Sequence, residues 1–94
     1  MRKSLYRFPS NKRAECASLC DQIIKLHEET NEVSRAFLDD ESDARIIEET
    51  WDVIQTAEGI LRKFPTWMVA IGFARVKLKS WHRGDYGRRR RWRS

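Results

Sequence analysis

Apolar residues recur every three or four positions along the first half of the chain. Ser10 or Asn11 is suited to cap a helix there, with Phe8–Pro9 as its lead-in. Because this spacing places side chains on one helix face, it predicts an amphipathic helix that ends before the acidic cluster at 39–42. Its apolar face comprises Cys16, Leu19, Ile23, Leu26, Val33 and Phe37, with Thr30 filling the gap.

Two further helices are expected after this cluster. Ser42 or Asp43 is suited to cap the second helix, and Pro65 ends it. Its apolar positions are Ile46, Ile47, Thr50, Val53, Ile54, Ala57, Ile60, Leu61 and Phe64. Thr66 is suited to cap a third helix, which gives way to a loop and tail after Trp81. The apolar positions of the third helix are Met68, Val69, Ile71, Phe73, Val76 and Leu78.

No stretch alternates between apolar and polar residues with period two, so no sheet is expected. The sequence therefore predicts an all-α fold of about three helices. A single short chain cannot cover the apolar faces of all three helices. We therefore expect two chains to cover them together by forming a four-helix-type core on oligomerisation. We divide the chain into a basic lead-in at 1–9, a helical domain at 10–82 and a basic, arginine-rich tail at 83–94.

Composition narrows the class of protein. The chain has 94 residues, of which 40% are hydrophobic and 35% charged, a balance typical of one globular domain. No apolar run approaches the roughly 20 residues of a membrane span, and the amino end, MRKSLYRFPSNKR, lacks the apolar core of a secretion signal. Two cysteines are too few for a disulfide scaffold. We expect a cytoplasmic protein without a membrane partner.

The net charge of +5 is distributed unevenly along the chain. Residues 1–13 carry five basic residues and no acid, and residues 59–94 carry eleven basic residues and one acid. Residues 14–58 carry thirteen acidic residues and three basic ones. The acidic middle is suited to a metal cation, and the basic ends are suited to phosphate.

The acidic block contains two similar carboxylate patterns, EETNE at 28–32 and EETWD at 48–52. Glu29 and Glu32 lie three residues apart and therefore share a helix face, and Glu49 and Asp52 repeat that spacing. If the two helices pack antiparallel, the four carboxylates converge at the rim of the core. Mg²⁺ takes such oxygen ligands together with substrate phosphates. The alternative interpretation is a solvated acidic face on each helix.

The stretches KLHEETNEV (25–33) and EETWDVIQTAEGIL (48–61) resemble the MazG-type nucleoside triphosphate pyrophosphohydrolases. The signature of that family is EExxE followed, after a gap, by ExxD. Here Glu28 to Glu32 match the first motif and Glu49 to Asp52 the second, and the resemblance extends over about residues 16–64. The chain departs at Asn31, where the family often has glycine, and at Trp51, where the family favours a small residue.

The resemblance implies an all-α enzyme that assembles as a homodimer or homotetramer. It implies Mg²⁺-dependent hydrolysis of a ribo- or deoxyribonucleoside triphosphate to the monophosphate and pyrophosphate, with Mn²⁺ as an alternative ion. By motif position, the metal ligands would be Glu29, Glu32, Glu49 and Asp52. Glu28 would orient a ligand or the attacking water, which makes Glu28 and Glu29 the candidate catalytic residues.

Basic residues outside the motifs are candidates for binding phosphate. We expect Lys77, Lys79 or Arg83 to contact the phosphates of the triphosphate. The residue that does so can belong to a neighbouring subunit. The alternative is that these side chains are solvated surface charges. The segment RRRRWRS (88–94) is suited to nucleic acid, since arginines neutralise phosphates and a tryptophan stacks on bases. A helical nucleic-acid-binding module that uses the basic termini is therefore one alternative function. A MazG-like structural partner without activity is another.

Overall fold

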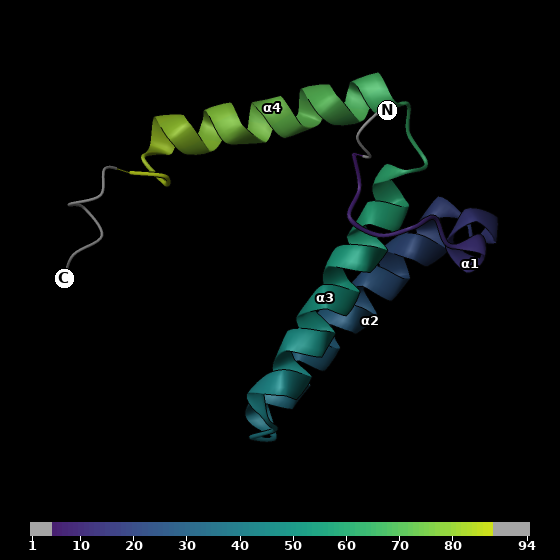
Figure 1. Cartoon of the computed structure of the whole chain (residues 1–94), viewed down its shortest axis with the longest axis vertical. Helices are drawn as coiled ribbons and strands as arrows, with labels where there is room; N and C mark the ends of the chain where they lie inside the picture. Colours follow the sequence, from purple (N-terminus) through teal and green to yellow (C-terminus); the bar gives the residue numbers. More distant parts are fainter. Residues whose placement is uncertain (1–4, 88–94) are drawn as a thin grey trace. The chain divides into compact units, whose positions relative to one another are not determined.

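The computed structural model describes residues 5–87, and these residues form four helices and no strand (Figure 1). The helices are α1 (Lys12–Cys16), α2 (Leu19–Leu38), α3 (Asp43–Leu61) and α4 (Thr66–Arg83). The predicted all-α class is confirmed. The chain divides into two units, Met1–Lys63 and Phe64–Ser94. The arginine-rich segment 88–94, for which nucleic-acid binding was predicted, lies outside the described residues.

The predicted first helix is two helices, because the chain becomes extended at Ala17 and Ser18. Asn11 caps α1 through hydrogen bonds that its side chain accepts from Arg13 N and Ala14 N. Ser18 has φ −71° and ψ 163°, and its hydroxyl accepts a hydrogen bond from Asp21 N. A second N-cap therefore starts α2 where a continuous helix was predicted.

The later helix boundaries follow the same capping rules with one correction. The Ser42 hydroxyl accepts from Arg45 N and begins α3 as predicted. Thr66 was expected to cap α4, but it is the first helical residue, and Pro65 stands at the N-cap without a side-chain hydrogen bond. Gly84 has φ 77°, a left-handed conformation that glycine adopts readily, and it ends α4 two residues later than predicted.

Helices α2 and α3 lie side by side and form the hairpin that carries both carboxylate motifs (Figure 1). The turn between them closes as a Schellman motif. Asp40 N donates to Phe37 O (3.1 Å) and Glu41 N donates to Ala36 O (3.0 Å), while Asp40 takes a left-handed φ of 57°. This short turn brings residues 28–32 of α2 alongside residues 49–52 of α3.

The lead-in before α1 packs on the outer side of α3. The Glu58 carboxylate accepts hydrogen bonds from Arg7 N (2.9 Å) and Phe8 N (3.0 Å). The Phe8 ring meets the Trp51 ring edge-on, with 6.0 Å between centroids. Trp51, where the chain departs from the MazG-type pattern, therefore serves as the packing surface for this lead-in.

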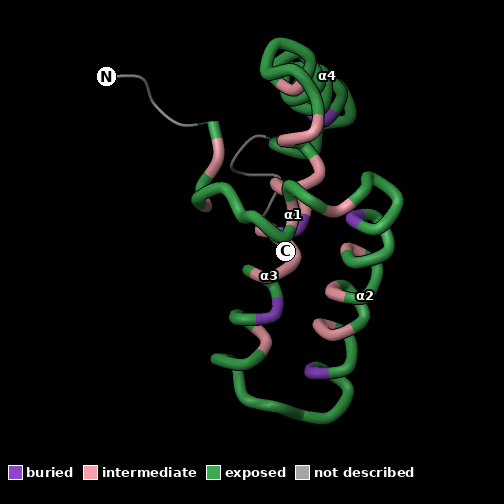
Figure 2. Tube along the Cα trace, turned by 90° about the vertical axis from the view of Figure 1, so that its right-hand side faces the viewer, coloured by how far each residue is buried: buried purple, intermediate pink, exposed green. Residues whose placement is uncertain are grey.

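The predicted apolar faces are largely uncovered within one chain. Among the described residues Ala36 is the only buried apolar residue, whereas Ile23 is 52% exposed and Phe37 69% exposed (Figure 2). The buried positions on α2 and α3 also include Gln22, Glu49 and Thr56. The hairpin interface is thus unusually polar. The four-helix-type core expected on oligomerisation stays a prediction.

Candidate functional site

The two motifs place acidic side chains on the sides of α2 and α3 that are shielded from solvent. Glu49 on α3 is buried, with 6% of its surface exposed, although charged residues are rarely buried without partners. Glu29, Glu32 and Asp52 are half-buried. Their i, i+3 spacing on each helix produces this arrangement once the hairpin closes.

The electrostatic environment of Glu49 links these groups across the hairpin. Burial raises the pKa of the Glu49 carboxyl above its usual range, and the nearby Arg45 guanidinium opposes that effect. A hydrogen bond with Asp52, the charge of Asp52 and the charge of Glu32 raise the same pKa further. Two of the other predicted ligands, one from each helix, therefore lie within electrostatic reach of Glu49.

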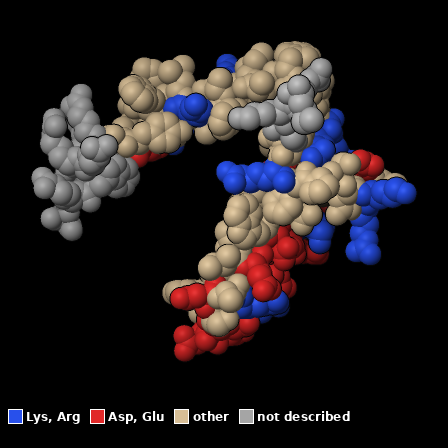
Figure 3. Space-filling view, viewed as in Figure 1, with Lys and Arg blue, Asp and Glu red and all other residues tan. Residues whose placement is uncertain are grey.

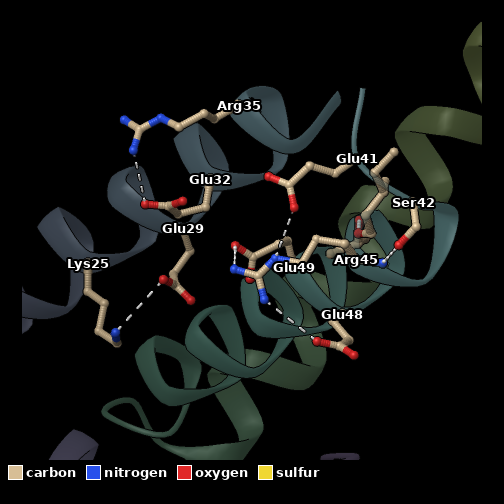
Figure 4. Close-up of polar contacts among 11 residues, drawn as sticks. Lys25, Glu29, Glu32, Arg35, Glu41, Ser42, Arg45, Glu48 and Glu49 are labelled. Carbon is tan, nitrogen blue, oxygen red and sulfur yellow. Dashed lines mark hydrogen bonds and ion pairs between the residues drawn. The ribbon is translucent and has the colours of Figure 1, made fainter. Parts of the chain in front are cut away.

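Basic side chains of the same helices engage these carboxylates (Figure 4). Lys25 Nζ lies 4.0 Å from Glu29 Oε1, and Arg35 Nη1 lies 3.6 Å from Glu32 Oε2. Arg45 Nη2 lies 3.5 Å from Glu49 Oε2, and the same guanidinium also pairs with Glu41 and Glu48. One arginine thus serves three carboxylates.

Within residues 5–87 no three His, Cys, Asp or Glu side chains are gathered as a ready metal-binding group. The donor set nevertheless fits a hard divalent cation, because it consists of carboxylate oxygens whose mutual repulsion a cation relieves. The competing ion pairs are short-range helix pairs with half-exposed basic partners, and such pairs contribute little stability. To bind a metal ion, the carboxylate side chains would have to rotate out of these ion pairs.

A cavity of about 490 Å³ lies beside the carboxylates, between the lead-in, α1, α2 and α3. Its volume is within the range of roughly 300–1,000 Å³ that is typical of small-molecule sites. Glu29 and Asp52 belong to its wall, so the cavity adjoins two of the four predicted metal ligands. Its basic lining residues are Arg13, Lys25 and Arg62. Two further carboxylates, Glu15 and Asp21, line it as well, together with amides of Asn11, Gln22 and Gln55.

Gly59 on α3 permits the close approach of α1 and α2 at this cavity. A Cβ atom at Gly59 would lie 3.2 Å from Gln22 Oε1 and 3.4 Å from Ala14 Cβ. Gln22 is 3% exposed, and its Nε2 donates to Ala14 O at 2.6 Å. The side chain of Gln22 therefore ties α1 to α2 across the space that a larger residue at position 59 would fill.

The sequence did not point to Arg13, Lys25 and Arg62 as site residues. They come from α1, α2 and the end of α3, and only the packing of α1 brings them to one cavity. For Lys25 the sequence did carry a signal, because Lys25 precedes the motif residue Glu29 by one helical turn. No sequence motif marks the other two.

The remaining candidates have other surroundings. Glu28 is exposed on α2. Lys77, Lys79 and Arg83 are exposed on α4, in the second unit. Lys77 Nζ lies 5.3 Å from the centroid of the Phe73 ring. Arg83 Nη2 pairs with Asp85 Oδ2 at 2.7 Å. Their contact with a triphosphate stays a prediction.

Comparisons with known proteins give no relative. No model of a known family matches the sequence, and no curated protein or solved structure matches it. Over residues 5–87, the structure contains no helix with the length and apolar character of a membrane span.

The raised pKa of Glu49 predicts how stability responds to pH. The folded chain retains the Glu49 proton more readily than the unfolded chain, so this group's contribution to stability falls as pH rises from 4.5 through the raised pKa. Glu49→Gln removes the buried charge. It should raise the melting temperature at pH 7, and the gain should shrink as pH falls through the raised pKa toward 4.5.

Thermal unfolding followed by circular dichroism from pH 3 to pH 8 checks this expectation. Glu48→Gln is the matched control, because the Glu48 side chain is 71% exposed and pairs with the same Arg45. A Glu49→Gln chain that is less stable than the wild type at pH 7, or a difference that is constant across pH, would contradict it.

Proposed function

We propose that this chain is a Mg²⁺-dependent nucleotide pyrophosphohydrolase, which cleaves a ribo- or deoxyribonucleoside triphosphate to the monophosphate and pyrophosphate. The observation that supports the proposal is that the charges of Glu32 and Asp52 act on the buried Glu49 across the hairpin, beside a cavity lined by both basic and acidic side chains. Glu29 belongs to that lining as well. The resemblance of both motifs to the MazG-type enzymes agrees with this chemistry.

In this proposal Glu29, Glu32, Glu49 and Asp52 hold the metal. A bound Mg²⁺ neutralises phosphate oxygens and lowers the pKa of a bound water. Glu28, next to Glu29 on α2, orients a ligand or the attacking water. The water oxygen bonds to the α-phosphorus and the bond from the α-phosphorus to the bridging oxygen breaks. A carboxylate of the two motifs accepts the proton of the water.

Basic side chains hold the triphosphate in this reaction. Lys25 lies one turn from Glu29, and Arg13 and Arg62 line the same cavity, which supports binding of the β- and γ-phosphates there. Lys77, Lys79 and Arg83 are a second source of positive charge, supplied by a neighbouring subunit. A homodimer or homotetramer is part of the proposal.

We assign the enzyme to nucleotide metabolism in the cytoplasm. Its substrates are abundant there, and the two free cysteines, Cys16 and Cys20, are exposed thiols that suit a reducing compartment. A helical nucleic-acid-binding module remains the second candidate, because α4 carries Arg75, Lys79 and Arg83 among exposed aromatic residues. A MazG-like structural partner without activity is the outcome if no triphosphate is cleaved.

A panel of ribo- and deoxyribonucleoside triphosphates with Mg²⁺ tests the reaction. At least one member should give the monophosphate and pyrophosphate in equal amounts, resolved by ion-exchange chromatography. The Glu32→Gln/Asp52→Asn double variant should lose at least about a hundredfold in kcat/KM, because two ligands lose their charge.

The matched control for this panel is Glu48→Gln, which neutralises a neighbouring exposed glutamate. It should keep activity within about twofold of the wild type. Release of orthophosphate in place of pyrophosphate, or equal activity in the double variant, would count against the proposal. Salt-sensitive binding of a labelled oligonucleotide without cleavage of any triphosphate would favour the nucleic-acid alternative.

The role of the cavity gives a separate prediction. Lys25→Gln should raise KM for the triphosphate about tenfold with kcat nearly unchanged, the equivalent of about 1.4 kcal/mol of substrate binding. Lys79→Gln on α4 is the matched control for the second source of positive charge. Steady-state kinetics on both variants decide whether the cavity or α4 binds the phosphates. A rise in KM confined to Lys79→Gln would assign phosphate binding to α4.

A further inference from the structure

Helix α4 carries an apolar stripe that the proposed reaction does not use. Its residues alternate in steps of four and three, which is the spacing of a helix-packing seam. We call it the α4 seam, and it comprises Trp67, Ile71, Ala74, Leu78 and Trp81. All five are exposed, and Trp81 is 70% exposed. Large aromatic side chains in such a row are typical of an interface.

The charge around the α4 seam indicates what covers it. From Thr66 to Gly84 the charged and titratable side chains are all basic, namely Arg75, Lys77, Lys79, His82 and Arg83. Pairing of two α4 helices would bring these like charges together, and that contact is unfavourable. The α4 seam therefore fits an acidic surface.

The same chain carries an acidic surface with matching spacing. On α2 the residues Leu19, Ile23, Leu26, Thr30, Val33 and Phe37 again alternate in steps of four and three, and we call this row the hairpin ledge. Ile23 and Phe37 are the more exposed of its large residues. Residues 19–61 around it carry twelve acidic and three basic side chains, and the acidic ones gather on the α2–α3 hairpin (Figure 3).

Two further observations favour a second copy of the chain over a lipid surface. A helix that lies on a membrane has one apolar face. Helix α4 has a second apolar row, Val69, Phe73 and Val76, on the side away from the α4 seam. In addition, Ala36 is the only buried apolar residue among those described, so a single chain buries little apolar surface.

We propose that α4 of one copy packs through its seam along the hairpin ledge of a second copy. The contact joins two apolar rows of the same spacing and brings a basic helix onto an acidic hairpin. It differs from a core in which the ledges of two hairpins pack together. It does not depend on the proposed activity.

Sedimentation velocity of the full chain over a range of concentrations tests the contact. The wild type should associate, and Leu78→Asp in the α4 seam and Ile23→Asp in the hairpin ledge should each weaken association at least about tenfold. Met68→Asp and Ile24→Asp are matched controls outside both rows. Ile24 is 52% exposed, as is Ile23, and the controls should stay within about twofold of the wild type.

A mixture of the two disrupted chains makes the test specific. The ledge of the Leu78→Asp chain and the α4 seam of the Ile23→Asp chain remain intact, so the mixture should recover one contact and form a heterodimer. Raising NaCl from 50 to 500 mM should weaken association of the wild type, because the two surfaces carry opposite charge. Circular dichroism at 222 nm confirms that each variant remains helical.

Other partners of the α4 seam would give different results, and each of these results would overturn the proposal. An effect of Ile23→Asp alone would indicate pairing of two ledges, and an effect of Leu78→Asp alone would indicate pairing of two α4 helices. A monomer at every concentration would exclude a second copy. A monomer that cosediments with phosphatidylserine vesicles, and loses this binding in Leu78→Asp, would assign the α4 seam to an anionic membrane.

Discussion

Burial of a carboxylate between two helices is the constraint on which the rest of this structure depends. Glu49 lies at the α2–α3 interface, and both its burial and the charges of Asp52 and Glu32 disfavour its ionised form. Arg45 offsets this only in part, because the same guanidinium also pairs with Glu41 and Glu48. A divalent cation at this point would remove the repulsion, which is why a costly arrangement in the hairpin favours a metal-dependent function.

The sequence predicted much of the hairpin because its determinants are local. Asn11 and Ser42 are caps in the structure, and the i, i+3 spacing of the carboxylates follows from helical geometry. The break at Ser18 was missed because the apolar spacing continues through it. The lining of the cavity was missed for another reason. Its position depends on contacts between distant residues, such as the hydrogen bond from Gln22 to Ala14 and the small size of Gly59.

The distribution of apolar surface connects the fold with assembly. Both the hairpin and α4 leave apolar rows exposed. The hairpin is acidic, whereas α4 is basic. Those rows had been expected to form a core between two chains, and the structure adds that α4 is a basic helix with two apolar sides. A partner that covers α4 would place basic residues against an acidic hairpin. Assembly and phosphate binding would then draw on the same uneven charge along the chain.

Direct titration of the purified chain with Mn²⁺, followed by electron paramagnetic resonance of the free ion, tests the central claim that the α2–α3 carboxylates bind a divalent cation. Mn²⁺ reports on a Mg²⁺ site because it shares a preference for oxygen ligands. The account predicts saturable binding that Mg²⁺ displaces, that Glu49→Gln abolishes and that Glu48→Gln retains. Absence of binding in the wild type, or equal binding in both variants, would contradict it.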